Sequence, residues 1–353
     1  MLDPKIIEDI VTLFKGKREF RYIQLCVSTR CFLSCTVCPR TYFLDRWDSK
    51  DMTFETFKNI SRFFPYTENI HLSGWGEPLL NPYFLVMVEI AKRAGCSVGF
   101  TTNGALLHDA MIKKIIDLQT DLVSVSLAGV TAETHESKRV GSRLKQLTRN
   151  LHSIADLKRT FRTDKPHVLI QFMMTSENMH ELPMSVELAA EVEADSVVAT
   201  NLDYTPLPFH EELRAFSSGK ADETFTRRVR ETGELARNKN ISFHAFPLEM
   251  KLVPVCSENP LNNFYVSEDG LVSPCVYLAP PIQEIPRIFC GENNVIPRTS
   301  FGNINEQRLF EIWSNSEYVF FRKKYEQRLR GILYRSVNYL PQVCKTCYKA
   351  YGV

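Results

Sequence analysis

The stretch Cys31-Phe32-Leu33-Ser34-Cys35-Thr36-Val37-Cys38 decides how this chain can be interpreted. Its three cysteines are spaced so that they can ligate three irons of a cubic iron-sulfur cluster, which would leave one iron without a protein ligand. Clusters that only carry electrons usually have four cysteine ligands, whereas an unligated iron can bind a small molecule. Taken alone, the triplet also fits part of a ferredoxin-type cluster or of a zinc site. The sequence around it separates these alternatives.

A pattern of alternating strands and helices surrounds the cysteines. Apolar and β-branched runs closed by glycine and polar residues predict strands over residues 20–28, 69–78, 97–104, 122–129, 167–174 and 196–201. Helical spacing predicts helices over residues 53–64, 82–94, 108–118, 141–159 and 180–192, with Thr53 as an N-cap and Gly95 after a helix end. Six strand-helix units predict an α/β fold, a partial (β/α)6 TIM-like barrel. Parallel barrels have their active sites at the carboxyl ends of the strands, where the polar residues of this chain lie.

Residues 20–210 resemble the radical S-adenosylmethionine enzymes. In that family a CxxxCxxC motif holds a 4Fe-4S cluster, and S-adenosylmethionine bound to the open iron is cleaved to a 5′-deoxyadenosyl radical. Gly74-Trp75-Gly76-Glu77-Pro78 looks like the Gly-Gly-Glu-Pro motif of the family, with Trp75 where a second glycine is more usual. The residue before the third cysteine is often aromatic in relatives and stacks near adenine, but here it is Val37.

The resemblance also implies which residues contact S-adenosylmethionine. Glu77 and the nearby backbone would hold the methionine ammonium, since a carboxylate can fix the orientation of a cation. Arg139 would pair with the methionine carboxylate, and Arg143 is the alternative. The implied cofactor-binding residues are Gly76, Glu77, Pro78, Thr102, Asn103, Ser126 and Arg139. No catalytic base can be named from the sequence.

The last third of the chain lacks the alternation of strands and helices and contains five cysteines. After Pro247 and Pro254 the alternation of helices and strands stops. A β-hairpin with Asp269-Gly270 at its turn is predicted before Cys275, and a Cys-x₂-Cys pair, Cys344 and Cys347, closes the chain. Two separated pairs of cysteines can fully ligate one cluster or one zinc ion.

This segment resembles the SPASM and shorter twitch extensions of radical S-adenosylmethionine enzymes. We therefore expect one auxiliary 4Fe-4S cluster, ligated by Cys256, Cys275, Cys344 and Cys347, with structural zinc as the alternative. Cys290 is left as a spare, and Cys26 and Cys96 are expected to be buried as small apolar residues. The expected domains are an N-terminal helix packed on the barrel, the radical S-adenosylmethionine barrel and the auxiliary cluster domain, at residues 1–19, 20–247 and 248–353.

Composition narrows the classes of protein to consider. The chain has 353 residues and a net charge of +2 with acids and bases interspersed, so nothing indicates a nucleic-acid partner. Apolar runs are too short to cross a bilayer, and no signal peptide opens the chain. The ten cysteines are expected to serve metal binding rather than disulfides. We therefore expect an oxygen-poor cytoplasm and a reducing partner such as flavodoxin or ferredoxin.

The resemblance predicts an oxidoreductase or maturase that abstracts a hydrogen atom from its substrate. Without an amino-terminal peptide-recognition domain or a strongly charged stretch, a compact substrate is favoured, through dehydrogenation of a small hydroxylated metabolite with the auxiliary cluster taking up or delivering an electron. The alternative is a peptide- or protein-modifying maturase that forms thioether or carbon-carbon bonds or formylglycine. A third hypothesis, from outside the enzymes, is a non-catalytic two-cluster electron carrier or scaffold, which would form no 5′-deoxyadenosine. Substrate identity depends on barrel loops, which the fold does not determine.

Overall fold

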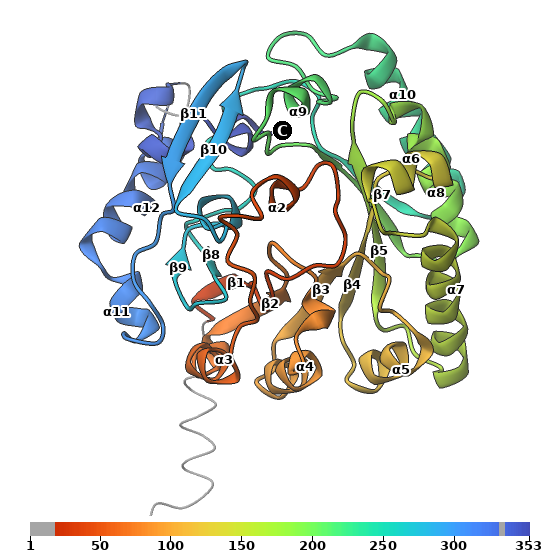
Figure 1. Ribbon diagram of the computed structural model, residues 1–353, viewed down its shortest axis with the longest axis horizontal. Coiled ribbons are helices and arrows are strands. Elements are labelled where there is room, and N and C mark those ends of the chain that lie inside the picture. The colour runs from red at the N-terminus through yellow and green to blue at the C-terminus, as the bar shows by residue number, and fades with distance from the viewer. Residues whose placement is uncertain (1–17, 332–335) are drawn as a thin grey trace, which may run out of the picture.

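The computed structural model describes residues 18–331 and 336–353. The helix predicted over residues 1–19 therefore lies almost wholly outside the described residues. The centre of the molecule is a curved sheet in which seven strands run parallel in sequence order, with the C-terminal region added at the β1 edge (Figure 1). These strands are β1 (Phe20–Leu25), β2 (Thr67–Leu72), β3 (Ser97–Thr102), β4 (Leu122–Leu127), β5 (His167–Met174), β6 (Ser196–Asn201) and β7 (Ser242–Ala245).

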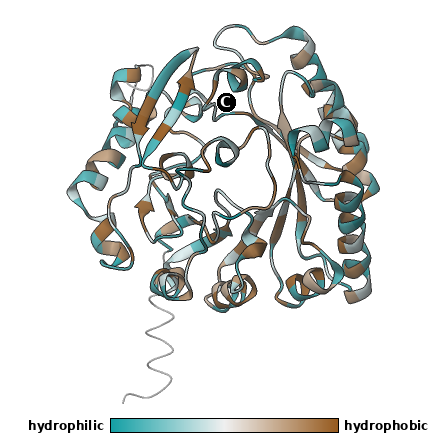
Figure 2. Ribbon diagram, viewed as in Figure 1, coloured by the Kyte–Doolittle hydropathy of each residue, from teal (hydrophilic) through white to brown (hydrophobic). Residues whose placement is uncertain are grey.

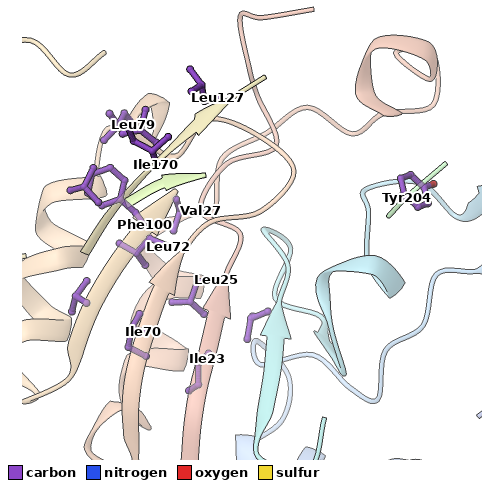
Figure 3. Packing of buried hydrophobic residues seen from close by; sticks show 14 of the residues in the cluster. Ile23, Leu25, Val27, Ile70, Leu72, Leu79, Phe100, Leu127, Ile170 and Tyr204 are labelled. Atoms are coloured by element: carbon purple, nitrogen blue, oxygen red, sulfur yellow. The ribbon is translucent and has the colours of Figure 1, made fainter. Parts of the chain in front are cut away.

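The two faces of this sheet differ in polarity because successive side chains point in opposite directions. In the parallel pair β1–β2, Ile23 is opposite Ile70 and Leu25 is opposite Leu72, and all four side chains are buried. Figure 3 shows these side chains packed together with Phe100 and Ile170 of neighbouring strands. The alternate positions carry polar side chains that line a cavity on the concave side, among them Gln24, Thr101, Ser126 and Gln171. The concave side of the sheet is therefore polar, and the side that faces the helices is apolar.

Helices cover the outside of the sheet and place apolar faces on it (Figures 1 and 2). Thr53 caps α3 by accepting a hydrogen bond from the backbone N–H of Thr56, and His108 caps α5 in the same way through Met111. The helices of the barrel are α2 (Pro39–Tyr42), α3 (Phe54–Ser61), α4 (Phe84–Arg93), α5 (Asp109–Asp117), α6 (Ala132–Lys138), α7 (Leu144–Phe161), α8 (Leu182–Glu191), α9 (Pro208–Glu212) and α10 (Glu223–Asn238).

The C-terminal region continues the barrel sheet. Strand β8 (Asn263–Val266) pairs in parallel with β1, and β9 (Val272–Ser273) pairs antiparallel with β8 as the predicted hairpin. A second hairpin, β10 (Glu284–Phe289) and β11 (Glu292–Pro297), precedes α11 (Leu309–Trp313) and α12 (Ser316–Leu329). Among the described residues, no helix is long and apolar enough to span a membrane.

The predicted α/β class with a parallel barrel sheet and a cysteine-rich C-terminal region is confirmed. The number of strands differs from the expected six because β7 completes a seventh unit and β8 adds an eighth parallel neighbour at the β1 edge. The hairpin β10–β11 was not predicted, since Pro286 and Pro297 lie inside it and proline argues against a strand. Cys26 and Cys96 are buried as expected.

Candidate functional site

The three N-terminal cysteines lie on the loop between β1 and α2, which many hydrogen bonds hold in place. The backbone N–H groups of Ser34 and Thr36 donate to the carbonyls of Val140 and Lys138 at 2.9 and 2.8 Å. The Arg40 guanidinium donates to the carbonyls of Cys31 and Leu33 at 2.5 and 2.7 Å. The loop therefore has a fixed path at the carboxyl end of the barrel.

The thiols of this loop share one partly buried space. Burial raises the pKa of Cys31 and Cys38, the latter to about 12, and the nearby Cys35 thiol adds to both increases. The Asn103 amide lies 3.9 Å from the Cys31 sulfur. In the described residues, no three Cys, His, Asp or Glu side chains converge on a single metal ion.

Glu77 ties the loop after β2 to the end of β3. Its side chain is 1% exposed, and its oxygens accept hydrogen bonds from the Thr102 hydroxyl at 2.7 Å and the Asn103 backbone N–H at 2.8 Å. A third bond comes from the Leu79 N–H at 3.2 Å, where Pro78 begins a 3-10 turn. Burial raises the pKa of Glu77 despite these bonds. Three predicted residues, Glu77, Thr102 and Asn103, are thus brought together, with the carboxylate occupied by the chain itself.

Close contacts leave no room for a side chain at the two glycines of the same loop, Gly74 and Gly76. A Cβ on Gly74 would lie 2.3 Å from the Cys26 sulfur, and a Cβ on Gly76 would lie 2.5 Å from the carbonyl oxygens of Ser28 and Arg30. Between them, Trp75 points toward the C-terminal region, where its indole N–H donates to the Val276 carbonyl at 3.1 Å. The residue that replaces the usual second glycine therefore joins the barrel loop to the segment after Cys275.

A cavity of about 550 Å³ occupies the concave side of the sheet. Ser126 and Arg139 line it together with Val37 and Trp75, and the Arg139 Nε is buried without a partner among the described residues. The alternative Arg143 is instead exposed and paired with Glu136 at 2.8 Å. The geometry thus favours Arg139 over Arg143 as a side chain available to a ligand.

The four cysteines predicted for the auxiliary site line one apolar pocket, although they come from three segments of the chain. Burial raises the pKa of Cys256, Cys275 and Cys344, and the neighbouring thiols contribute to each increase. Cys290 is exposed at the turn of the β10–β11 hairpin and does not line this pocket. The four cysteines predicted as auxiliary ligands therefore line a single pocket, which is compatible with four sulfurs around one cluster.

Family models match the two regions of the chain that contain the two sets of cysteines. Residues 25–189 match the Radical SAM superfamily, and residues 256–348 match the SPASM iron-sulfur cluster-binding domain. The chain is a radical S-adenosylmethionine enzyme with a C-terminal SPASM domain. It therefore binds S-adenosylmethionine and carries 4Fe-4S clusters, as this family does.

Relatives of this radical S-adenosylmethionine enzyme match over most of its length. A tungsten-containing aldehyde ferredoxin oxidoreductase cofactor-modifying protein from Pyrococcus furiosus is 28% identical over 346 residues, which is 93% of this chain and 87% of the relative. A PqqA peptide cyclase from Bradyrhizobium diazoefficiens is 24% identical over 327 residues, 91% of this chain and 77% of the relative.

Solved structures share the fold. Streptococcus suis SuiB bound to S-adenosylmethionine has a TM-score of 0.61 at 16% identity, covering 88% of this chain and 70% of that chain. Native anSMEcpe with bound AdoMet has a TM-score of 0.60 at 17% identity, covering 92% of this chain and 89% of that chain.

Three residues separate the main cavity from the cysteine pocket and escaped sequence-based prediction. Glu258, Tyr277 and Lys349 line both spaces. The Lys349 ammonium pairs with Asp203, which follows β6, at 2.5 Å and lies 4.2 Å from the centre of the Phe246 ring. We call Asp203, Glu258, Tyr277 and Lys349 the cavity wall. A signal was available, since Glu258 and Lys349 each follow a predicted cluster ligand by two residues.

Proposed function

We propose that this radical S-adenosylmethionine enzyme oxidises a polar substrate held between a cluster on Cys31, Cys35 and Cys38 and one auxiliary cluster on Cys256, Cys275, Cys344 and Cys347. The observation that carries the proposal is the shared cavity wall. One cavity is lined both by Val37, on the loop of Cys31, Cys35 and Cys38, and by residues that also line the cysteine pocket. When bound, the cluster and S-adenosylmethionine supply a 5′-deoxyadenosyl radical that abstracts a hydrogen atom.

The chain's own residues hold the cofactor in this proposal. The unpartnered Arg139 Nε supplies a donor for the methionine carboxylate, and Ser126 lines the cavity beside it. Glu77 fixes the end of β3 through Thr102 and Asn103. In the proposal, the adjacent backbone of Gly76 and Pro78 would hold the methionine ammonium. Apolar Val37 leaves adenine without an aromatic partner at that position.

The relatives favour maturation chemistry as the purpose of the oxidation. The names of the Pyrococcus and Bradyrhizobium proteins specify a modified cofactor and a cyclised peptide, and this chain matches each over more than nine-tenths of its length. The substrate in this hypothesis is a peptide or the precursor of an enzyme cofactor. This substrate class differs from the small hydroxylated metabolite that the sequence alone favours.

Dehydrogenation of a small hydroxylated metabolite stays the second candidate because the inner face of the barrel is polar. Gln24 donates to the Ser73 carbonyl at 3.1 Å, and the His71 ring bonds the Thr101 hydroxyl at 2.9 Å. Such side chains can exchange these bonds for substrate hydroxyl groups. In both candidates the electron enters from a small reductant of the flavodoxin or ferredoxin kind, in an oxygen-poor cytoplasm.

Anaerobic reconstitution with iron and sulfide tests the proposal. We expect about eight irons per chain and 5′-deoxyadenosine after S-adenosylmethionine and dithionite are added. Changing Cys31, Cys35 and Cys38 together to Ala should leave about four irons and abolish 5′-deoxyadenosine. Cys290→Ala is the matched control and should retain both.

Other results would change the assignment. About four irons accompanied by zinc would make the C-terminal site structural. Complete absence of 5′-deoxyadenosine from the reconstituted wild-type protein would contradict the proposed chemistry.

A further inference from the structure

The cavity wall carries more acceptors than donors. Lys349 is 5% exposed, and its ammonium is already paired with Asp203 at 2.5 Å. Glu258 also lines the cavity, and no ion pair within 4.0 Å among the described residues includes it, although the Lys349 ammonium lies near enough to interact with its charge. Of the wall's two carboxylates, Asp203 therefore contacts Lys349 directly and Glu258 does not.

A second acceptor at this end of the cavity is also unused. Asn201, the last residue of β6, is 4% exposed and lines the cavity. Its side-chain amide donates to the Pro247 carbonyl at 2.9 Å, while its Oδ1 has no partner among the described residues. Because this buried amide is independent of the Glu258 carboxylate, two separate features at one end of the cavity lack donors.

We propose that Glu258 anchors a positively charged nitrogen group of the substrate, an ammonium or a guanidinium-like group rich in N–H donors. A carboxylate that lines a partly enclosed cavity without an ion-pair contact is stabilised by a cation that arrives with the substrate. Charge-assisted hydrogen bonds of this kind are short and directional, and a carboxylate can accept two parallel N–H groups at once.

The anchor has a consequence for the reaction. Glu258 is two residues from Cys256, and it lines both the main cavity and the cysteine pocket. A nitrogen group bound there places the rest of the substrate along the cavity toward Trp75 and Arg139, which also line it. The substrate class specified in this way rests on the proposed function and narrows it to molecules that carry a cationic nitrogen.

A pair of probes that differ only in charge tests the anchor. Argininamide carries a guanidinium, and citrullinamide has a neutral ureido group of nearly the same shape. Each is titrated calorimetrically into the anaerobically reconstituted protein with S-adenosylmethionine bound. We expect argininamide to bind about tenfold more tightly than citrullinamide, the ratio expected for one charge-assisted contact.

Three variants locate the effect. Glu258→Gln should reduce the ratio of the two dissociation constants to about one, since the amide keeps the shape of the side chain and loses the charge. Asp203→Asn should also lower the ratio, because Lys349 would then be free to neutralise Glu258. Glu306→Gln, which makes the same change at an exposed site outside the cavity, is the control and should leave the ratio unchanged. Circular dichroism and iron content establish that each variant is folded.

Several outcomes would overturn the anchor. Equal affinities in the wild-type protein, a preference that persists in Glu258→Gln, or no detectable binding of either probe at millimolar concentration would each do so. The 5′-deoxyadenosine assay on the wild-type protein separates this failure from that of the proposed function. If the wild-type protein forms 5′-deoxyadenosine but does not prefer argininamide, the radical chemistry is supported and the Glu258 anchor is refuted. If it prefers argininamide but forms no 5′-deoxyadenosine, the anchor is supported and the radical chemistry is refuted.

Discussion

Single residues of this enzyme show how burial changes the chemistry of a carboxylate. Glu77 and Glu268 are both almost fully buried, but Glu77 accepts three hydrogen bonds and Glu268 accepts none among the described residues. The guanidinium of Arg298 lies 3.8 Å from Glu268 and makes closer contacts with Asp269. Burial, with Asp269 adding to it, raises the pKa of Glu268 from 4.5 to about 7.

We predict that Glu268 makes stability fall as the pH rises. Between pH 4.5, its ordinary pKa, and about 7, the folded protein keeps a proton that the unfolded chain has released. The stabilisation is therefore complete below the lower value and lost above the higher one. Glu268→Gln should be as stable as the wild type near pH 5 and more stable at pH 8, by on the order of 2 kcal/mol. Anaerobic thermal unfolding at the two pH values measures this, and an equal difference at both would refute it.

Sequence patterns identify some residues of the site and miss others for a physical reason. The cysteines, Gly76 and Glu77 lie in short contiguous motifs whose spacing is itself the signal. In the cavity wall, Glu258 and Lys349 each follow a predicted cluster ligand by two residues, but Asp203 is distant from both in sequence and meets Lys349 only in the folded chain. Folding creates that juxtaposition, so local spacing cannot predict it.

Among the elements, the β8–β9 hairpin connects the barrel to the auxiliary site. Its turn is held by Asn303 and Asn305, whose side-chain amides donate to the Asp269 carbonyl at 3.1 and 3.2 Å. At the other end of the hairpin, Cys275 follows the last residue of β9 by two residues. The position of one predicted cluster ligand thus depends on a tightly packed turn.

We predict that Gly270→Ala loosens this hairpin. Gly270 has a φ of +88°, and a Cβ would lie 2.5 Å from Nδ2 of Asn305 and 2.6 Å from Oδ1 of Asn303. Gly291, with a φ of +84° and nothing within 4 Å, is the matched control for backbone strain alone. Gly291→Ala should cost about 1 kcal/mol, whereas Gly270→Ala should cost about 1–3 kcal/mol more. Anaerobic thermal unfolding and iron content check both variants, and equal losses would show that the asparagine contacts are unimportant.

Several elements with a strong periodic pattern were predicted, although the amphipathic helix α10 (Glu223–Asn238) was missed. Strands β5 and β6 were predicted to the residue, since apolar and β-branched side chains fill them. Strand β7 was missed because its four residues, Ser-Phe-His-Ala, are too few to establish an alternation. The helix bounds differ by one to three residues, as at α4, which begins at Phe84 and not at Pro82.

At the scale of the whole molecule, the barrel and the SPASM domain share one sheet. Backbone bonds run from the Arg21 N–H to the Asn262 carbonyl at 3.0 Å and from the Cys26 N–H to the Val266 carbonyl at 2.9 Å. Phe20 packs between Phe264 and Trp313, with ring centres 5.1 Å apart in each case. The predicted boundary at residues 247 and 248 therefore divides the sequence at a point where the two parts remain joined by a strand pair.

We therefore predict that a chain ending at residue 247 does not fold as an independent barrel. Removing β8 would expose the hydrogen-bonding edge of β1, the ring of Phe20 and the indole of Trp75, and an open apolar edge favours aggregation. Expressed alone, residues 18–247 should be aggregated by size-exclusion chromatography, whereas co-expression with residues 248–353 should restore a soluble complex. The unbroken chain, purified in parallel, is the control. A monodisperse truncated chain with undiminished helical circular dichroism would show that the barrel is stable without the shared strand pair, and the boundary at 247 would then mark two independently folding domains.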